Sequence, residues 1–456
     1  MQENQNQNQN QQNPNQQKQQ NPNQKNKPKA KNKPKGKGKG KGKGKGKGKG
    51  KGKNNPKTES KYKEKTESKQ PKSSKKEARK TENITSEGAK QEQTSPPTIP
   101  VDELFEDKNF PIGIEMEYPN DNTSRITNEE LRMKERMMLS DILPYLRKAA
   151  EVHRQTRQFA NAFIRPGIKL WDMCVEIEEM NRKLISAQGL EAGLAFPTGC
   201  SINNCAAHYT PNKGDDRTLG KSDVMKIDFG LHINGYIIDS AYTVCFDPKF
   251  DPLLKASREA TNAAVKAAGI DVRLCDLGEI IQEVIESHEV EIDGKVHNIV
   301  PIQNLSGHSL GPYEIHSGKS VPLVKGTEQK TRMEEGELFA FETFASTGKG
   351  VVSDENPTSH YMMRPDTSIS LVTNPKARPL YHVIEKNFGT LAFCPRWLDR
   401  LDQTRYLFNL KHLVDSNVVR PYPPLSDING SFVSQFEHTL ILKPSCKEVL
   451  SKGDDY

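Results

Sequence analysis

The most informative stretch of the chain is VMKIDFGLHINGYIIDSAYTV at residues 224–244. Asn234-Gly235 between two apolar runs is the strongest short signal for a β-hairpin. With these residues as the turn, paired residue numbers sum to 469, so Asp228 opposes Ala241 and Asp239 is a diagonal neighbour on the same face. Two carboxylates on one face of an apolar hairpin are costly unless a positive group lies between them. A solvated face is the alternative, which the surrounding isoleucines and Phe229 disfavour.

Three further positions place polar side chains inside apolar strand patterns. Glu342 lies in LFAFETF, Glu437 lies in SFVSQFEHTLIL, and His308 lies in the glycine-rich segment NLSGHSLGPYEIH. A single glutamate in a strand usually faces solvent, but four strand carboxylates and one histidine form an oxygen-rich set. Such a set suits two adjacent divalent ions, whose combined charge balances the carboxylates. Two ions sharing a water favour hydrolytic chemistry.

The segment GCSINNCAAHYTP at residues 199–211 admits two interpretations. Cys200, Cys205 and His208 could be zinc ligands, but no fourth ligand follows at zinc-site spacing, so we expect both cysteines to be buried thiols. His208 and His316 are better candidates for groups that hydrogen-bond a peptide carbonyl or carry a proton, with a structural histidine as the alternative for each. The sequence has no G-x-S-x-G elbow, H-E-x-x-H helix or Walker loop to support a competing mechanism.

Apolar periodicity along the rest of the chain predicts a repeated order of elements. Helices are expected at 144–164, 170–188, 252–268 and 274–288, strand-rich stretches at 193–246 and 297–345, and a last strand at 435–442. Two helices followed by strands, twice, predict a duplicated α+β unit. Residues 359–424 interrupt this order with a more helical segment.

The first hundred residues differ in composition from the rest of the 456-residue chain. Residues 1–100 hold 27 Lys/Arg against 8 Glu, a net charge of +19, which leaves 40 of the 67 basic and 51 of the 59 acidic residues elsewhere, a net of −11. An Asn/Gln/Pro-rich section (2–28), nine Lys-Gly pairs (35–52) and a mixed polar section (53–98) contain almost no apolar residues. We therefore expect a disordered basic tail over residues 1–105 and a catalytic domain over 106–456. The lysines suit a polyanion such as ribosomal RNA; DNA, acidic protein, lipid headgroups or a purely solubilising role remain alternatives.

Other compositional features narrow the cellular setting. No apolar run approaches the ~18 residues of a membrane span, and no apolar segment resembling a secretory signal opens the chain. Seven scattered cysteines do not suggest a disulfide framework. These features predict a cytoplasmic protein without a membrane partner.

Several ordered motifs resemble methionine aminopeptidases of type 2, over about residue 110 to the end of the sequence. They are FPTGCSINNCAAHYTP, KIDFG with GYIIDSAYTV, NLSGHSLG with IHSGKSVP, MEEGE with FETF, SHYM, GTLAFC with RWLDRL, YPPL and FEHT. The resemblance implies the pseudo-twofold "pita-bread" α/β architecture with a helical insertion at 359–424, and a basic tail like that of eukaryotic members. It implies removal of the initiator methionine from nascent chains with a small second residue.

The resemblance also assigns roles to individual residues. It makes Asp228, Asp239, His308, Glu342 and Glu437 the ligands of two divalent ions (cobalt, manganese, iron or zinc), with His208 and His316 as the catalytic and substrate-contacting histidines. The implied methionine pocket comprises Phe196, Ile315, His360, Ala392 and Tyr422. The sequence departs from the expected pattern at Ser306, where we expect Asn, and at Ser426, where relatives carry Cys; neither position is an implied ligand.

Two rival functions share the fold. A proline-specific peptidase is disfavoured by the HYTP and YPPL segments and the insertion, and a catalytically inactive binder of RNA or ribosomes is disfavoured by the complete ligand set. The resemblance further leads us to expect a monomer, with translation initiation factors as additional candidate partners.

Overall fold

The computed structural model describes residues 91–105, 107–120, 128–326 and 330–456. The three sections predicted for the basic tail therefore lie wholly or largely outside the described residues. Within the described ranges, no helix is long and apolar enough to cross a membrane.

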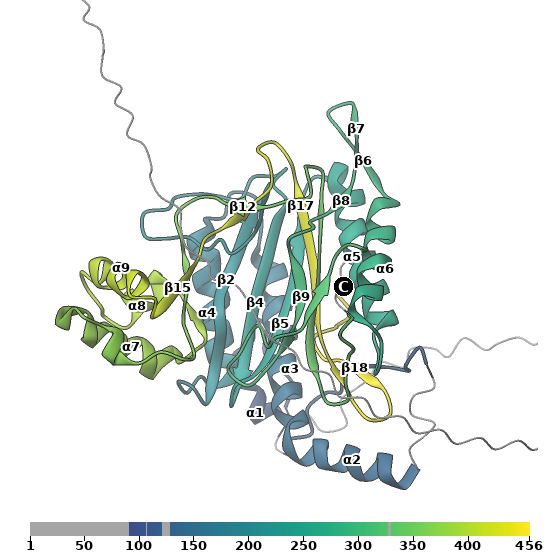
Figure 1. The fold of residues 1–456 in the computed structure, drawn as a ribbon, viewed down its shortest axis with the longest axis horizontal. Coiled ribbons are helices and arrows are strands. Elements are labelled where there is room, and N and C mark those ends of the chain that lie inside the picture. Colours follow the sequence, from purple (N-terminus) through teal and green to yellow (C-terminus); the bar gives the residue numbers. More distant parts are fainter. Residues whose placement is uncertain (1–90, 106, 121–127, 327–329) are drawn as a thin grey trace, which may run out of the picture. The chain divides into compact units, whose positions relative to one another are not determined.

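The predicted repeat of helices and strands is confirmed (Figure 1). The first set comprises helices α3 (Leu143–Phe163) and α4 (Leu170–Ile185) and strands β2 (Ala192–Ile202), β3 (Cys205–Ala207), β4 (Met225–Ile233) and β5 (Tyr236–Val244). The second comprises helices α5 (Asp251–Ala267) and α6 (Leu274–Glu286) and strands β6 (Glu289–Ile292), β7 (Lys295–Asn298), β8 (Val300–Pro301), β9 (Ser306–Leu310), β10 (Ser320–Pro322) and β11 (Leu338–Ser346). Helix α4 ends earlier than predicted, because Ser186 adopts a left-handed φ of 59°.

The central hairpin forms in the predicted register. Strands β4 and β5 place Asp228 opposite Ala241, and Asp239 opposite Gly230. Asn234 and Gly235 adopt φ angles of 50° and 82°, as a tight hairpin turn requires. A Cβ atom at Gly235 would lie 2.4 Å from the Tyr313 ring, so this turn also needs glycine for close packing.

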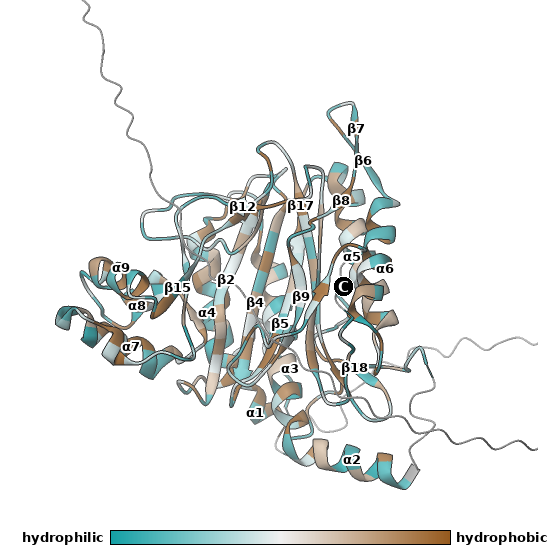
Figure 2. Cartoon of the chain, viewed as in Figure 1, coloured by the Kyte–Doolittle hydropathy of each residue, from teal (hydrophilic) through white to brown (hydrophobic). Residues whose placement is uncertain are grey.

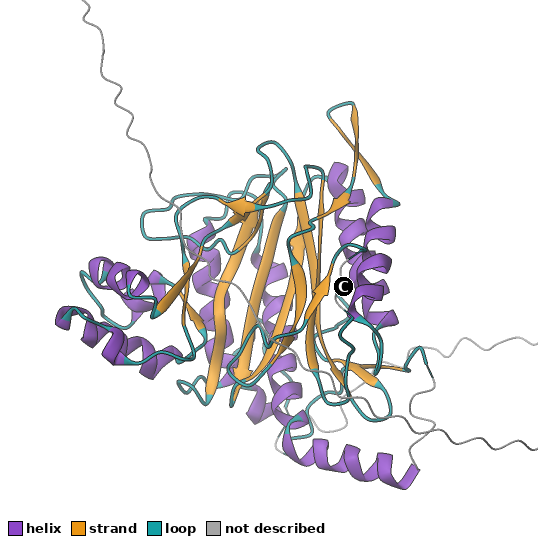
Figure 3. Ribbon diagram, in the orientation of Figure 1, coloured by secondary structure: helices purple, strands orange, loops and turns teal. Residues whose placement is uncertain are grey.

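Two sheets carry the site, and Figure 3 shows their strands in orange, side by side. One has the order β2-β4-β5; the other has the order β1-β18-β17-β11-β9-β10, with β8 pairing to β11. Its remaining members are β1 (Ile114–Met116), β17 (Val433–Leu442) and β18 (Lys447–Val449). Strand β17 confirms the predicted last strand, and its register places Glu437 directly opposite Glu342 on β11.

Helices cover one side of both sheets (Figure 1). Helices α3 and α4 contact β4 and β2, while α5 contacts β11 and β17. Their inward faces are apolar, as the brown stripes in Figure 2 show, and buried residues form three packed clusters beneath them. The site therefore lies on the strand face that these helices leave open.

The predicted insertion forms a helical subdomain beside β2 (Figure 1). It contains helices α7 (Arg378–Phe388), α8 (Pro395–Arg400) and α9 (Leu407–Asp415), and 3₁₀ turns at Ile369–Leu371 and Pro375–Ala377. It also contains a small sheet in the order β14 (Ala392–Phe393), β13 (His360–Met363) and β15 (Val419–Tyr422). Strands β12 (Ser353–Asp354) and β16 (Leu425–Ser426) join β3 in a second small sheet.

The N-terminal boundary and one helix differ from the prediction. Val101, Leu104 and Phe105, in and after α1 (Val101–Leu104), are buried in the core, so the packed domain begins before residue 106. Helix α2 (Asn128–Asp141) was not predicted, because it is mostly exposed and lacks a clear apolar stripe.

Candidate metal centre and substrate cavity

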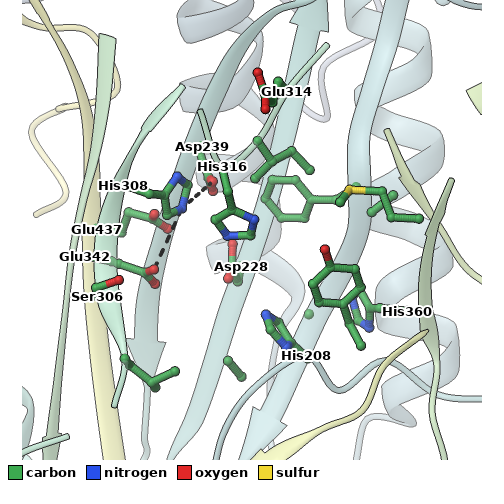
Figure 4. A pocket seen from close by; sticks show the side chains of 18 of the residues that line it. His208, Asp228, Asp239, Ser306, His308, Glu314, His316, Glu342, His360 and Glu437 are labelled. Carbon is green, nitrogen blue, oxygen red and sulfur yellow. Dashed lines mark ion pairs between the residues drawn. The ribbon is translucent and has the colours of Figure 1, made fainter. Parts of the chain in front are cut away.

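One cavity of about 680 Å³ collects the candidate residues from both sheets and the insertion (Figure 4). All twelve residues predicted as metal ligands, catalytic histidines or methionine-pocket residues line it: Phe196, His208, Asp228, Asp239, His308, Ile315, His316, Glu342, His360, Ala392, Tyr422 and Glu437. These residues come from segments more than 200 positions apart, so the fold assembles a site that no local motif contains.

The candidate metal ligands converge at one end of this cavity. Asp239, His308 and Glu437 are buried, and each offers a ligand atom within 4.8 Å of the others. His308 Nε2 lies 3.7 Å from Asp239 Oδ2 and 3.8 Å from Glu342 Oε1, beyond hydrogen-bond distance. Asp228 and Glu342 are half-buried and complete the cluster on the open side.

Burial sets the protonation of these groups. It raises the pKa of Asp228 to about 7 against the lowering effect of a hydrogen bond from Gln435. Burial and the neighbouring carboxylates raise the pKa values of Asp239 and Glu437 well above their usual range. Burial, reinforced by His316, lowers the pKa of His308 to about 3, so its imidazole is neutral and can donate a lone pair.

The donor set fits divalent cations. Four carboxylates and a neutral imidazole are ligands for hard or borderline ions, and buried carboxylates of raised pKa need a compensating positive charge. Two buried oxygens of the cluster, Asp228 Oδ1 and Glu437 Oε2, have no hydrogen-bond partner in the described part of the chain. Such buried orphans are expected where an ion supplies the missing partner.

Gln435 is a site residue that sequence reasoning missed. Its Nε2 donates to Glu342 Oε2 at 3.0 Å and lies 3.5 Å from Asp228 Oδ2, which joins carboxylates from the two sheets. It lies two residues before Glu437 on the same face of β17, and this spacing was the available signal.

Both candidate histidines lie next to the cluster and on the same side of it (Figure 4). His316 packs edge-on against His308, with ring centroids 4.4 Å apart. The His208 ring lies near those of Tyr422 and His360, with centroids 5.7 and 6.1 Å away. Burial, with help from His316, lowers the pKa of His208 to about 4, so it is neutral near pH 7 and able to donate one hydrogen bond.

An apolar wall closes the other end of the cavity. Phe196, Ile315, His360 and Ala392 are buried there and Tyr422 is half-buried. The insertion's small sheet pairs His360 with Tyr422, which explains how two residues far apart in sequence face one space. Met362 and Tyr313 also line the cavity and were not predicted, because neither interrupts a pattern in the sequence.

The zinc interpretation of residues 199–211 is not supported. Cys200 and Cys205 are buried free thiols, and Cys200 Sγ lies 3.6 Å from the thiol of Cys174. Burial raises the pKa values of both Cys200 and Cys205, which makes their thiolate forms unfavourable. The expectation of buried thiols is confirmed.

Comparisons with known proteins agree with this geometry. Residues 144–364 match the model of metallopeptidase family M24. The chain is 56% identical over 365 residues to methionine aminopeptidase 2A of Arabidopsis thaliana, covering 80% of this chain and 82% of that protein. It is 52% identical over 366 residues to methionine aminopeptidase 2 of Schizosaccharomyces pombe, covering 80% and 85%. A solved structure of a thermophilic Arx1 shares the fold, with a TM-score of 0.58 at 18% identity over 68% of this chain and 90% of that one.

Proposed function

Since the chain belongs to the methionine aminopeptidase 2 family within the M24 metallopeptidases, we propose how its own residues remove an N-terminal methionine. The family assignment predicted from the sequence is confirmed, together with the pita-bread fold. The observation that carries the proposal is the convergence of four carboxylates and His308 beside an apolar wall in one cavity.

In this proposal Asp228, Asp239, His308, Glu342 and Glu437 hold two divalent ions. When bound, such ions make a water nucleophilic near neutral pH and polarise the peptide carbonyl. Gln435 keeps Asp228 and Glu342 in place by donating to both. The neutral His308 contributes a lone pair without adding charge.

The histidines next to the cluster act on the peptide in this proposal. His208 donates a hydrogen bond to the scissile peptide and stabilises charge that develops on it, which a neutral imidazole can do without first losing a proton. His316, which is exposed and packs against His308, contacts the substrate backbone. The two groups thereby orient the bond to be cleaved.

The apolar wall selects the first residue of the substrate. Phe196, Ile315, Ala392 and Tyr422 offer an apolar lining for a flexible thioether side chain. The Phe196 ring packs so closely on Gly230 that a Cβ there would lie 2.2 Å from it, which fixes this wall. With the side chain so placed, the free amine lies toward the carboxylates, so we expect N-acetylated peptides to resist cleavage.

We further propose that cleavage is co-translational and limited to small second residues. The test is hydrolysis of Met-Ala-Ser, Met-Lys-Ser and Leu-Ala-Ser peptides with added manganese or cobalt. We expect efficient cleavage of the first peptide only, because the family resemblance implies that the site excludes a long second side chain and because leucine lacks the thioether. Efficient release of methionine from Met-Lys-Ser would contradict the limit on the second residue, while leaving a methionine-specific enzyme.

The basic tail adds a second candidate role, association with ribosomes. The charge of +19 in residues 1–100, opposed by −11 in the remainder, favours contact of the tail with RNA phosphate rather than contact of the catalytic domain. Such contact would bring the enzyme to emerging N-termini in the cytoplasm.

A further inference from the structure

The two strands that carry the buried carboxylates belong to different sheets and are joined by side-chain hydroxyls. Thr439 Oγ1 on β17 accepts from the Asp239 amide at 2.8 Å and donates to the Asp239 carbonyl at 2.5 Å. Thr243 Oγ1 on β5 makes the equivalent pair with the amide and carbonyl of Gln435, at 2.8 and 2.7 Å. We call these hydroxyl contacts between β5 and β17, made by Thr243 and Thr439, the hydroxyl seam. The seam, rather than backbone-to-backbone hydrogen bonds, sets the separation of Asp239 from Glu437.

The centre of the seam is Ser240, which neighbours Asp239. Ser240 Oγ donates to the carbonyl of Glu437 at 2.7 Å. Because successive strand side chains point to opposite faces, Ser240 lies behind the carboxylate cluster and outside the cavity. It therefore links the backbones of two proposed ligands without contacting the substrate space.

The side chain of Tyr456 closes the seam from behind. Its hydroxyl lies 2.6 Å from Ser240 Oγ and 3.3 Å from the Glu437 carbonyl. The two hydroxyls and the Glu437 carbonyl thus form one hydrogen-bonded group, in which either hydroxyl can donate to the other. The Tyr456 ring stacks on His438 at 4.8 Å and contacts Phe436 at 5.5 Å, the two residues that flank Glu437 on the rear face.

Helix α3 anchors this tyrosine. The guanidinium carbon of Arg157 lies 4.5 Å from the centre of the Tyr456 ring, and the Arg157 side chain is fully buried. Arg157 donates to both carboxylate oxygens of Asp455 and, at 3.1 Å, to the carbonyl of Ser451. Residues 451–456 are thus held in one position behind β5 and β17.

We propose that Tyr456 is a positioning residue for the metal centre. Through Ser240 it fixes the backbones of Asp239 and Glu437, so that their carboxylates approach one another before an ion binds. This inference rests on the proposed metal ligands. It assigns a role in metal affinity to a residue outside the cavity.

The test is Mn²⁺ binding to the full chain by titration calorimetry, for the wild type and for Tyr456→Phe. The variant retains the ring and its stacking but loses the hydroxyl. We expect Mn²⁺ affinity to weaken roughly three- to tenfold, the worth of one net hydrogen bond. Activity on Met-Ala-Ser should fall at low Mn²⁺ and recover when Mn²⁺ saturates the enzyme.

Two further variants sharpen the test. Ser240→Ala should weaken Mn²⁺ affinity as Tyr456→Phe does. The double variant should bind Mn²⁺ no more weakly than the weaker-binding single variant, because both substitutions remove the same Tyr456–Ser240 hydrogen bond. Tyr145→Phe is the matched control: Tyr145 is partly exposed on α3, and its hydroxyl has no hydrogen-bond partner within the described ranges. It should bind Mn²⁺ like the wild type.

The outcomes separate this inference from the proposed function. If the wild type binds no Mn²⁺, the proposed ligand set is wrong. If the wild type binds Mn²⁺ and Tyr456→Phe binds it equally well, the positioning role is overturned and the proposed function stands. A lower melting temperature of the metal-free variant with unchanged affinity would also overturn it, because that pattern indicates a structural contact alone.

Discussion

At His208 the backbone itself directs the side chain. Its φ of 64° lies in the left-handed region, which residues other than glycine seldom adopt. The Ser359 hydroxyl donates to the His208 carbonyl at 3.3 Å and accepts from the Thr210 amide at 3.2 Å, which holds this conformation from the insertion. Such conformations persist where the surroundings fix them, and they cluster at functional sites.

Replacing His208 therefore tests its chemistry apart from its backbone. We expect His208→Ala and His208→Asn to retain metal and to lower kcat by about 10²–10⁴, the worth of a positioned polar catalytic group. Asparagine tolerates a positive φ, so it separates loss of the imidazole from backbone strain. Because the pKa of His208 is lowered to about 4, the wild-type kcat should show no titration of this group around pH 7. Exposed His382, changed to alanine, is the control; wild-type kcat in both His208 variants would exclude the role.

Asp239 provides a second residue-scale prediction. Asp239→Asn replaces one anionic ligand by an amide, so we expect lower bound metal and no measurable turnover, with the fold retained. Metal analysis of the purified protein and circular dichroism measure these effects. Asp216→Asn, at an aspartate whose side chain is 88% exposed, should change neither. Normal metal content and activity in Asp239→Asn would remove Asp239 from the ligand set.

Among the elements, the short strand β18 is fastened by the carboxylate of Glu448, which pairs with Arg147 at 2.7 Å and with Lys443 at 3.2 Å. The fully buried Glu448 accepts from Arg147 Nε at 2.9 Å and Nη2 at 2.7 Å, and from the Gly113 amide at 3.0 Å. Burial alone would raise the pKa of Glu448, but the bonds from Arg147, with Lys443 nearby, outweigh it and lower the pKa below its usual range. The pair thereby fastens β18 to helix α3 and to the segment preceding β1.

This pair predicts a pH dependence of stability. Because the folded pKa is below the unfolded value of about 4.3, the stabilisation is fully present above pH 4.3 and is lost as the pH falls through the folded pKa. Glu448→Gln should lower the free energy of unfolding by about 3–5 kcal/mol near pH 7, since it leaves Arg147 buried without its charge partner. Urea unfolding at several pH values measures the difference in free energy of unfolding between Glu448→Gln and the wild type. This difference should shrink as the pH falls into the acid range. Exposed Glu289→Gln should show no difference, and a constant difference for Glu448→Gln would refute the assignment.

Elements differ in how far their sequence determines them. The β4–β5 hairpin was predictable to the residue, since Asn234-Gly235 fixes the turn and an alternating pattern fixes the faces. Helix α2 was not predictable, because an exposed helix has no apolar stripe to identify it. The sheet that joins His360 to Tyr422 could be anticipated only through the family resemblance, because pairing across some 60 residues leaves no local pattern. Tyr456 gave no signal at all, since an isolated aromatic residue after a polar segment has no periodicity.

For the whole molecule, the charge difference between tail and domain predicts where the enzyme is found. Deleting residues 1–90 removes 27 Lys/Arg and 7 Glu but spares Gln93, whose Nε2 donates to Gln155 at 2.9 Å, and Ile99, which packs on the core. Peptide turnover should be nearly unchanged. Co-sedimentation with ribosomes should weaken, and the binding of the full chain should fall steeply with salt.

A length-matched control isolates charge from chain length. Changing the nine lysines of the Lys-Gly repeat at 35–51 to glutamine keeps the tail but removes its densest charge. It should lose much of the ribosome association that deletion loses. Equal pelleting of the full chain, the glutamine variant and the deletion would indicate that the tail only solubilises the protein.

The small sheet β14-β13-β15 separates two functions along the chain. Residues that recognise the substrate's first side chain lie in one segment, and the proposed metal ligands lie outside it. Residues 359–424 supply His360, Ala392 and Tyr422 to the proposed methionine pocket but none of the five proposed metal ligands. The stretch beyond Ser359, which holds the His208 backbone, can therefore change during evolution or be exchanged in the laboratory without replacing a proposed metal ligand. Related enzymes can therefore acquire a preference for a different N-terminal side chain through substitutions in one contiguous segment. The five proposed metal ligands, which lie outside that segment, stay the same.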